Sequence, residues 1–154
     1  MNKFLYIEND IFLAEIVLQI KEGNKTVIIA RGNSMRPFIM DRRDQLILAP
    51  VQTEDLQVGQ CVLATTNLGK IVLHRIIKKQ GDQLTLCGDG NWNQLEYTST
   101  HEVLGVLHGV IRKGRTYYCT GRVWRFYSWC WTKLYPIRRW LIGIDYRTLR
   151  KWNM

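Results

Sequence analysis

The sequence predicts a mainly β protein: a small coiled antiparallel β fold with an N-terminal helix and C-terminal amphipathic helices. Short runs rich in β-branched residues follow one another up to residue 119, and turn residues separate them. Beyond residue 120 the apolar spacing becomes helical. Because 154 residues suffice for one domain with its own core, we expect an N-terminal helix over 1–24, a β domain over 25–119 and a basic aromatic helical tail over 120–154.

The first element is a helix that Asp10 can cap and that ends at Gly23-Asn24. Apolar residues such as Ile16 and Ile20 fill more than one of its faces, which predicts docking against the rest of the chain. Acidic residues interrupt the apolar sequence of this segment, so it lacks the continuous apolar stretch of a signal peptide. We therefore expect a cytoplasmic protein.

The β-branched runs predict seven strands, at 26–30, 45–49, 60–66, 70–78, 83–87, 103–112 and 117–119. The turn sequences at 67–69 and 80–82 are short enough for hairpins, so three consecutive strands form a meander. The strand at 70–78 is apolar on both faces and is expected in the middle of the sheet. Because side chains alternate along a strand, His74 and Arg75 should lie on opposite faces.

The last segment predicts two short amphipathic helices joined at Tyr135-Pro136. The two apolar stripes comprise Trp124, Tyr127, Trp131 and Leu134 in the first helix, and Ile137, Trp140, Leu141, Ile144 and Thr148 in the second.

Charge is distributed unevenly along the chain. Residues 1–111 hold 11 Lys and Arg against 12 Asp and Glu, whereas residues 112–154 hold 11 Lys and Arg against one acid, Asp145. Trp and Tyr interleaved with basic residues suit the headgroups of an anionic membrane, so we expect peripheral attachment of 122–152 to the inner leaflet. Packing of the helices on the β core with solvated arginines ranks equally, and nucleic-acid binding ranks third.

Metal and disulfide chemistry are not indicated. The four cysteines are far apart without a Cys-x-x-Cys pair, and the three histidines lack the spacing of zinc ligands. We expect reduced thiols and neither a metal nor an organic cofactor. The sequence has no stretch of about 18 apolar residues, so it does not predict a membrane-spanning helix. The sequence does not indicate an oligomeric state.

Three segments carry residues suited to nucleophilic catalysis. In "RGNSMRP" at 31–37, Ser34 needs a base to take its proton and backbone donors to stabilise an oxyanion. His74, in "VLHRII", can accept a proton near neutral pH. Asp89, in "LCGDGN", follows a strand next to that of His74 and can accept a hydrogen bond from the second ring nitrogen. Taken singly, these residues also fit a polar turn, a core histidine and a turn aspartate.

Together these segments resemble the serine peptidases that include signal peptidase I and the LexA-type self-cleaving repressors. The resemblance covers about residues 27–111. It depends on "GNSMRPFI" at 32–39, "DQLILAPV" at 44–51, "LQVGQCVLA" at 56–64, "VLHRII" at 72–77 and "LCGDGN" at 86–91, in this order.

The resemblance implies the coiled β fold of these peptidases, with Ser34 as nucleophile and His74 as general base. The "HRI" sequence is similar to the branch that uses histidine rather than lysine. In that branch an aspartate assists the histidine, which corresponds to Asp89, and a second acid follows, for which Glu96 is the nearest candidate.

The loop around the serine is implied to bind the substrate and the oxyanion through Gly32, Met35 and Pro37. Many signal peptidases have an oxyanion-donating serine at the position of Gly32, so the amide of Ser34 is the expected donor here.

The function predicted from the sequence is a serine endopeptidase that cleaves a peptide or protein precursor with a Ser-His dyad. One alternative is a non-catalytic module that binds a peptide on the same fold. The other is a nucleic-acid-associated regulator of the LexA type, although the DNA-binding domain and Ala-Gly cleavage segment of those repressors are not found in the sequence.

Overall fold

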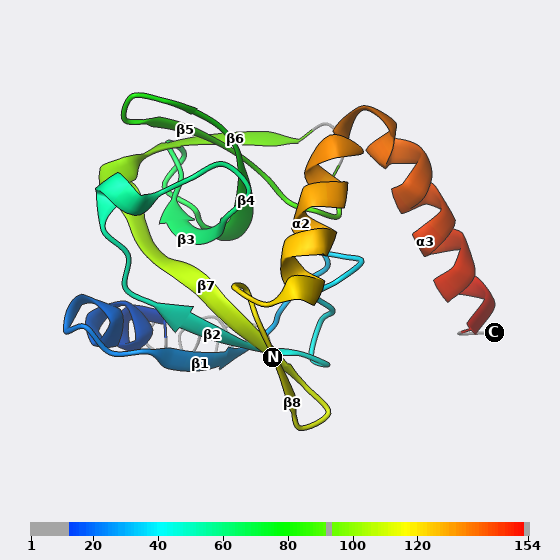
Figure 1. Cartoon of the computed structure of the whole chain (residues 1–154), viewed down its shortest axis with the longest axis horizontal. Coiled ribbons are helices and arrows are strands. Elements are labelled where there is room, and N and C mark those ends of the chain that lie inside the picture. The colour runs from blue at the N-terminus through cyan, green and yellow to red at the C-terminus, as the bar shows by residue number, and fades with distance from the viewer. Residues whose placement is uncertain (1–12, 92–93, 153–154) are drawn as a thin grey trace, which may run out of the picture.

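The computed structural model of the chain describes residues 13–91 and 94–152 and has a mainly β architecture, as predicted (Figure 1). In this part of the chain one eight-stranded antiparallel sheet has the strand order β1-β2-β7-β3-β4-β5-β6, with β8 also paired to β7. The strands are β1 (Thr26–Ile29), β2 (Gln45–Ala49), β3 (Cys61–Thr65), β4 (Ile71–Gln80), β5 (Gln83–Cys87), β6 (Leu95–Ser99), β7 (Val103–Arg112) and β8 (Arg115–Tyr118).

The predicted meander is present, and β4 lies between β3 and β5. Gly69 and Gly81 have positive φ in the two hairpin turns, a conformation that glycine adopts at little cost. The strands β2, β5 and β7 have the bounds predicted from the sequence. Strand β6 was not predicted, because its sequence LEYTS is partly polar and its residues are mostly exposed or half-buried.

Residues 13–21 form the described part of the N-terminal helix; the predicted cap Asp10 and Ile11 lie outside the described residues. The helix ends at Gly23, which has a φ of 88°. The amide of Gly23 donates to the Ile20 carbonyl and the amide of Asn24 donates to the Gln19 carbonyl, the pattern of a Schellman cap.

Two helices follow the sheet: α2 (Arg122–Lys133) and α3 (Arg138–Trp152), joined by the 3₁₀ turn η3 (Tyr135–Ile137). Figure 1 shows α2 against the sheet, whereas α3 extends away from the β domain. Trp124 and Trp131 of α2 are buried, as expected for a helix that packs on the core. None of the helices that the structure describes is long and apolar enough to cross a membrane.

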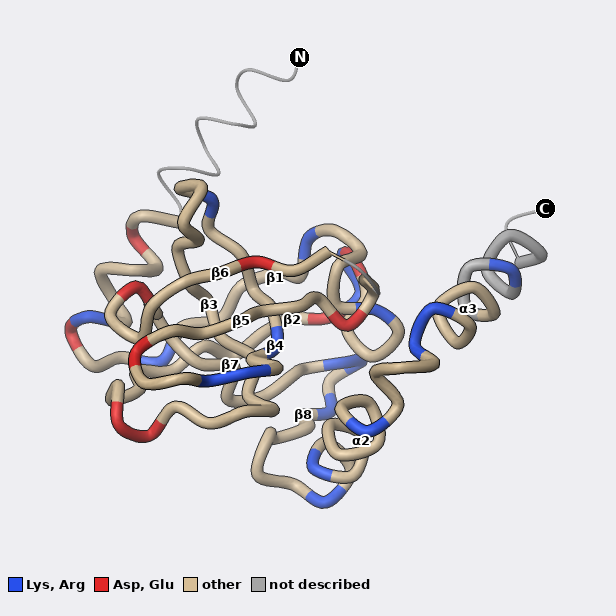
Figure 2. Tube along the Cα trace, turned by 90° about the horizontal axis from the view of Figure 1, so that it is seen from above, with Lys and Arg blue, Asp and Glu red and all other residues tan. Residues whose placement is uncertain are grey.

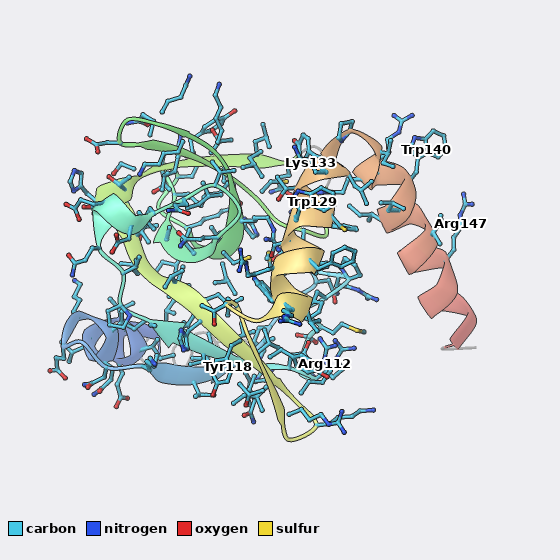
Figure 3. All side chains as sticks on the ribbon, in the orientation of Figure 1. Arg112, Tyr118, Trp129, Lys133, Trp140 and Arg147 are labelled. Atoms are coloured by element: carbon cyan, nitrogen blue, oxygen red, sulfur yellow. The ribbon has the colours of Figure 1, made fainter. Side chains whose placement is uncertain are left out.

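Basic residues gather at the helical end of the molecule. In Figure 2 the coloured positions of α2 and α3 are the blue of Lys and Arg, whereas the red acidic positions lie in the rest of the molecule. Figure 3 shows that Trp140 and Arg147 of α3 point away from the β domain.

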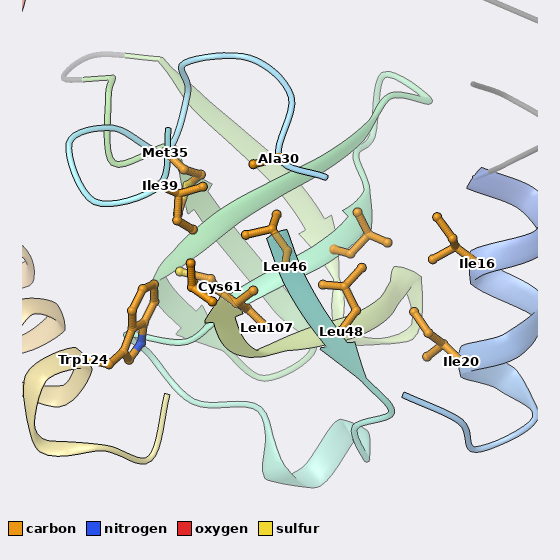
Figure 4. Close-up of a cluster of buried hydrophobic side chains, with 12 residues drawn as sticks. Ile16, Ile20, Ala30, Met35, Ile39, Leu46, Leu48, Cys61, Leu107 and Trp124 are labelled. Carbon is orange, nitrogen blue, oxygen red and sulfur yellow. The ribbon is translucent and has the colours of Figure 1, made fainter. Parts of the chain in front are cut away.

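Two groups of buried side chains form the core. The larger one joins the N-terminal helix, the sheet and α2, because it contains Ile16, Leu46, Leu107 and Trp124 (Figure 4). The smaller one lies between β3, β4 and β5 and contains Val62, Ile76 and Leu86. Strand β7 connects the two parts of the sheet, because its first residues pair with β3 and its last residues pair with β2 and β8.

Candidate active site

The loop between β1 and β2 carries Ser34 and is closed by hydrogen bonds at its base. The amide of Ala30 donates to the Asp44 carbonyl and the amide of Arg42 donates to the Ala30 carbonyl, each over 2.8 Å. Within the loop the amide of Gly32 donates to Asp41 Oδ1, also over 2.8 Å. The Ser34 segment is therefore held as a closed loop at the end of β1.

Asp44 anchors this loop to the sheet. Its buried carboxylate accepts hydrogen bonds from Arg112 Nε over 2.8 Å, from Arg43 Nε over 3.0 Å and from the Met40 amide over 2.9 Å. Burial by itself would raise the pKa of Asp44, but these hydrogen bonds lower it to about 2. The Nη2 group of Arg112 also donates to the carbonyl of Phe38. Arg112 of β7 therefore binds both Phe38 and Asp44, the two ends of the segment 38–44.

The Ser34 loop packs directly on the glycine turn that follows β5. The amide of Gly90 donates to the Ser34 carbonyl over 2.8 Å. A Cβ atom on Gly88 would lie 2.4 Å from that carbonyl oxygen and 3.1 Å from His74 Nε2, and one on Gly90 would lie 2.5 Å from the Asn33 carbonyl. These two glycines are therefore required by close backbone contact, and Gly88 marks the point where the Ser34 backbone and the His74 ring meet.

Ser34 and His74 line the same cavity, which has a volume of about 740 Å³. Its walls are mostly apolar and come from the N-terminal helix, β1 and the start of β4. His74 is buried and Ser34 is half-buried. Within the described residues no hydrogen bond joins Ser34 Oγ to His74 Nε2. Catalytic hydrogen bonds are often long in unliganded enzymes and shorten when substrate binds.

His74 Nδ1 and Glu96 Oε2 form a hydrogen bond. The sheet register explains the pairing. Ile76 is opposite Leu86, and Leu86 is opposite Glu96. Directly opposite residues share a face, and so do residues two apart in one strand, so His74, Ile76 and Glu96 lie on the same face. The contact with Glu96 fixes the orientation of the His74 ring. In this orientation Nε2 is the ring nitrogen beside Gly88.

Asp89 does not make the contact with His74 that the sequence predicted. Arg75 donates to both of its carboxylate oxygens, from Nε over 2.8 Å and from Nη2 over 2.7 Å, and the Tyr127 hydroxyl donates to Oδ2 over 2.8 Å. Arg75 is opposite Cys87 in the sheet, so the turn after Cys87 starts on the Arg75 face rather than on the His74 face. The carboxylate beside the histidine is therefore that of Glu96.

The Arg75–Asp89 ion pair is fully buried and connects the glycine turn to α2. Arg75 also donates to the Gly59 carbonyl over 2.7 Å and lies over the rings of Trp124 and Tyr127. Burial would lower the pKa of Arg75, but its charged and hydrogen-bonded neighbours, Asp89 foremost among the carboxylates, raise it well above the usual value. Burial and the adjacent carboxylate raise the pKa of the Tyr127 hydroxyl, so it stays protonated and donates.

The three loop residues predicted to bind substrate or oxyanion differ in position. Gly32 and Met35 line the cavity, but Pro37 is not among the described residues that do. The Met35 side chain is buried in the larger core group. The Gly32 amide donates to Asp41, whereas the amide of Ser34 has no hydrogen-bond partner within the described residues. The Ser34 amide is thus available as an oxyanion donor, and that of Gly32 is not.

Sequence reasoning missed Arg75 and Tyr127 as residues that support the site. An arginine in the middle of a strand that is apolar on both faces was a signal, because a buried guanidinium needs a carboxylate partner. No local signal pointed to Tyr127, which reaches Asp89 from α2. Within the described residues no group of three or more His, Cys, Asp and Glu side chains could hold a metal ion.

No family model and no curated protein matches the chain. The resemblance of its segments to signal peptidase-like enzymes therefore stays a prediction.

Proposed function

We propose that the protein is a serine endopeptidase resembling signal peptidase, on a variant of the coiled β peptidase fold, and that it cleaves a peptide or protein precursor. The observation that carries the proposal is the meeting of Ser34 and His74 at Gly88 in one cavity, with Glu96 on the far ring nitrogen. Ser34 supplies the nucleophile, His74 the base and Glu96 the carboxylate that orients the base.

In the proposed mechanism, His74 Nε2 takes the proton of Ser34 Oγ as the oxygen attacks the peptide carbonyl. The amide of Ser34 donates to the oxyanion. The protonated ring then gives its proton to the leaving amine, and water releases the acyl group in the reverse sequence of proton transfers. Glu96 stabilises the charged imidazole because it accepts the hydrogen bond from Nδ1 throughout.

The cavity suits an extended peptide with apolar side chains. Strand β1 is at the edge of the sheet and leads directly into the Ser34 loop, so its outer backbone groups can pair with an added strand. Val27 and Ile29 of β1 are exposed and line the cavity. A peptide paired with β1 would reach Ser34 at the end of that strand.

The test compares new protein N-termini across the proteome of source cells that carry wild-type protein or Ser34→Ala. A small set of N-termini that disappears in Ser34→Ala and in His74→Ala, but not in Ser99→Ala, is the expected result. Ser99 is a matched control, because it lies on β6 and its side chain makes no cap hydrogen bond. Unchanged N-termini in a folded, expressed Ser34→Ala protein would refute peptidase activity.

The second candidate function is a non-catalytic module that binds a peptide. The missing hydrogen bond between Ser34 Oγ and His74 Nε2 in the described residues, together with the apolar cavity beside an edge strand, favours it. Tight binding of a candidate peptide that Ser34→Ala leaves unchanged, without any cleavage, would select this function. Slow turnover by the wild type that Ser34→Ala abolishes would select the enzyme.

A further inference from the structure

The outward side of the C-terminal helices carries exposed aromatic and basic residues that packing does not explain. In α2 the residues that contact the β domain are Trp124, Tyr127 and Trp131. Arg122, Phe126, Trp129 and Lys133 repeat at helical spacing on the opposite face. The exposed fractions of Phe126 and Trp129 are 69% and 61%, so both rings lie largely in solvent, and Trp129 and Lys133 also line an open cavity beside Val58.

The same combination continues beyond α2. Ile137 in η3 and Trp140 at the start of α3 are 48% and 65% exposed, and the Arg139 guanidinium lies over the Trp140 ring. Trp140 and Arg147 project from α3 away from the β domain (Figure 3). We call Phe126, Trp129, Ile137 and Trp140, with Arg122 and Lys133, the outer helical surface.

We propose that the outer helical surface binds the interface of an anionic lipid membrane. Three observations argue for lipid as the partner. Residues 112–154 carry 11 basic residues and one acid, which attracts an anionic surface. Indole rings beside arginines suit the headgroup level of a bilayer. Val123 and Ile137 have exposed aliphatic side chains. Their apolar surface is removed from water when they enter the acyl boundary of a membrane, whereas a nucleic acid offers them no apolar partner.

Charge also argues against the other occupants of this surface. A second copy of the chain would bring two strongly basic helix pairs together, and their repulsion opposes such a dimer.

The helix α2 is already anchored by its inner face, since the Tyr127 hydroxyl and Trp131 Nε1 both donate to Asp89. It therefore presents the outer helical surface from a fixed position. This membrane proposal does not depend on peptidase activity.

The test is sedimentation of the full-length protein with vesicles of phosphatidylcholine alone or with about 30 mol% phosphatidylglycerol, an anionic lipid. The protein should pellet with the anionic vesicles and not with the neutral ones. The variant Phe126→Ser/Trp129→Ser/Trp140→Ser should lower vesicle partitioning at least ~10-fold, because it removes the inserted apolar area. Brominated acyl chains should quench wild-type tryptophan fluorescence, which electrostatic adsorption without insertion would not produce.

The control variant Leu68→Ser/Tyr97→Ser removes exposed apolar side chains outside the helices and should bind like wild type. Circular dichroism checks that both variants are folded; if the helical variant is not, Trp129→Ser alone and the brominated lipids decide. Equal pelleting with both kinds of vesicle, wild-type pelleting by the helical variant, or binding of a single-stranded oligonucleotide without vesicle binding would overturn the proposal.

Discussion

His74 and Arg75 are adjacent in β4, yet their side chains lie on opposite faces of the sheet and pair with different carboxylates. His74 contacts Glu96, and Arg75 forms a buried ion pair with Asp89. The first pair belongs to the proposed chemistry, whereas the second holds the glycine turn on which the Ser34 loop packs. We therefore expect variants of Glu96 to change the rate of cleavage and variants of Asp89 to change the stability of the fold.

Replacing Glu96 should affect cleavage far more than stability. Glu96→Gln keeps the size of the side chain but removes the charge that stabilises a protonated His74, so we expect cleavage to fall at least ~100-fold. Rates of peptide cleavage and urea unfolding measured on the same preparation check this. Wild-type rates in Glu96→Gln would remove the carboxylate from the mechanism.

Replacing Asp89 should affect stability first. Asp89→Asn leaves the buried Arg75 without its counter-charge, which should lower the free energy of unfolding by about 3–5 kcal/mol. Tyr127→Phe removes a single hydrogen bond to the same carboxylate and should cost about 1.5 kcal/mol. Urea unfolding followed by circular dichroism measures both. A loss below about 1 kcal/mol in Asp89→Asn would show that the ion pair does not support the fold.

The glycine turn should not tolerate a methyl group. The added Cβ of Gly88→Ala would lie 2.4 Å from the Ser34 carbonyl oxygen, so the loop or the turn must move. We expect a loss of about 1–3 kcal/mol of stability and at least ~10-fold slower cleavage.

Gly143→Ala is the matched control, because no atom lies within 4 Å of the added Cβ and the position is in α3. It should gain up to about 1 kcal/mol through helix propensity. A Gly88→Ala protein with wild-type stability and cleavage would contradict the close contact between turn and loop.

Asp44 should make stability depend on pH in the acid range. Its pKa falls from 3.8 to about 2 on folding, so the ionised group stabilises the folded state above about pH 4. This contribution, about 2 kcal/mol, is lost as the pH falls toward 2. Urea unfolding between pH 5 and 2, roughly the window of that titration, should show a shallower decline for Asp44→Asn than for wild type. Parallel curves would exclude Asp44 as the source.

Most of the fold could be predicted from local patterns, because strands with β-branched residues and glycine turns carry their own signals. The failure at β6 has a physical reason: Leu95–Ser99 is at the edge of the sheet, so it need not be apolar on either face. The prediction that His74 and Arg75 face opposite ways is confirmed by their separate partners.

The partner of His74 could not be read from the sequence without β6. Its identity depends on the register from β4 through β5 to β6, which places Glu96 on the His74 face. Asp89 was the nearer carboxylate in sequence, but it follows Cys87, which is opposite Arg75. The basic tail was predicted to bind a membrane or to pack on the core. Its first helix packs on the core through one face, and membrane binding through the opposite face stays a prediction.

The pairing of β7 also determines when the site can form during synthesis. Arg112 reaches back 68 residues to Asp44, and Tyr127 of α2 reaches back 38 residues to Asp89. A chain still attached to the ribosome lacks these contacts until β7 and α2 have emerged, and such distant pairings form late because long loops must close first. The Ser34 loop therefore stays unassembled on the nascent chain until β7 and α2 are available, which delays any cleavage by the proposed site.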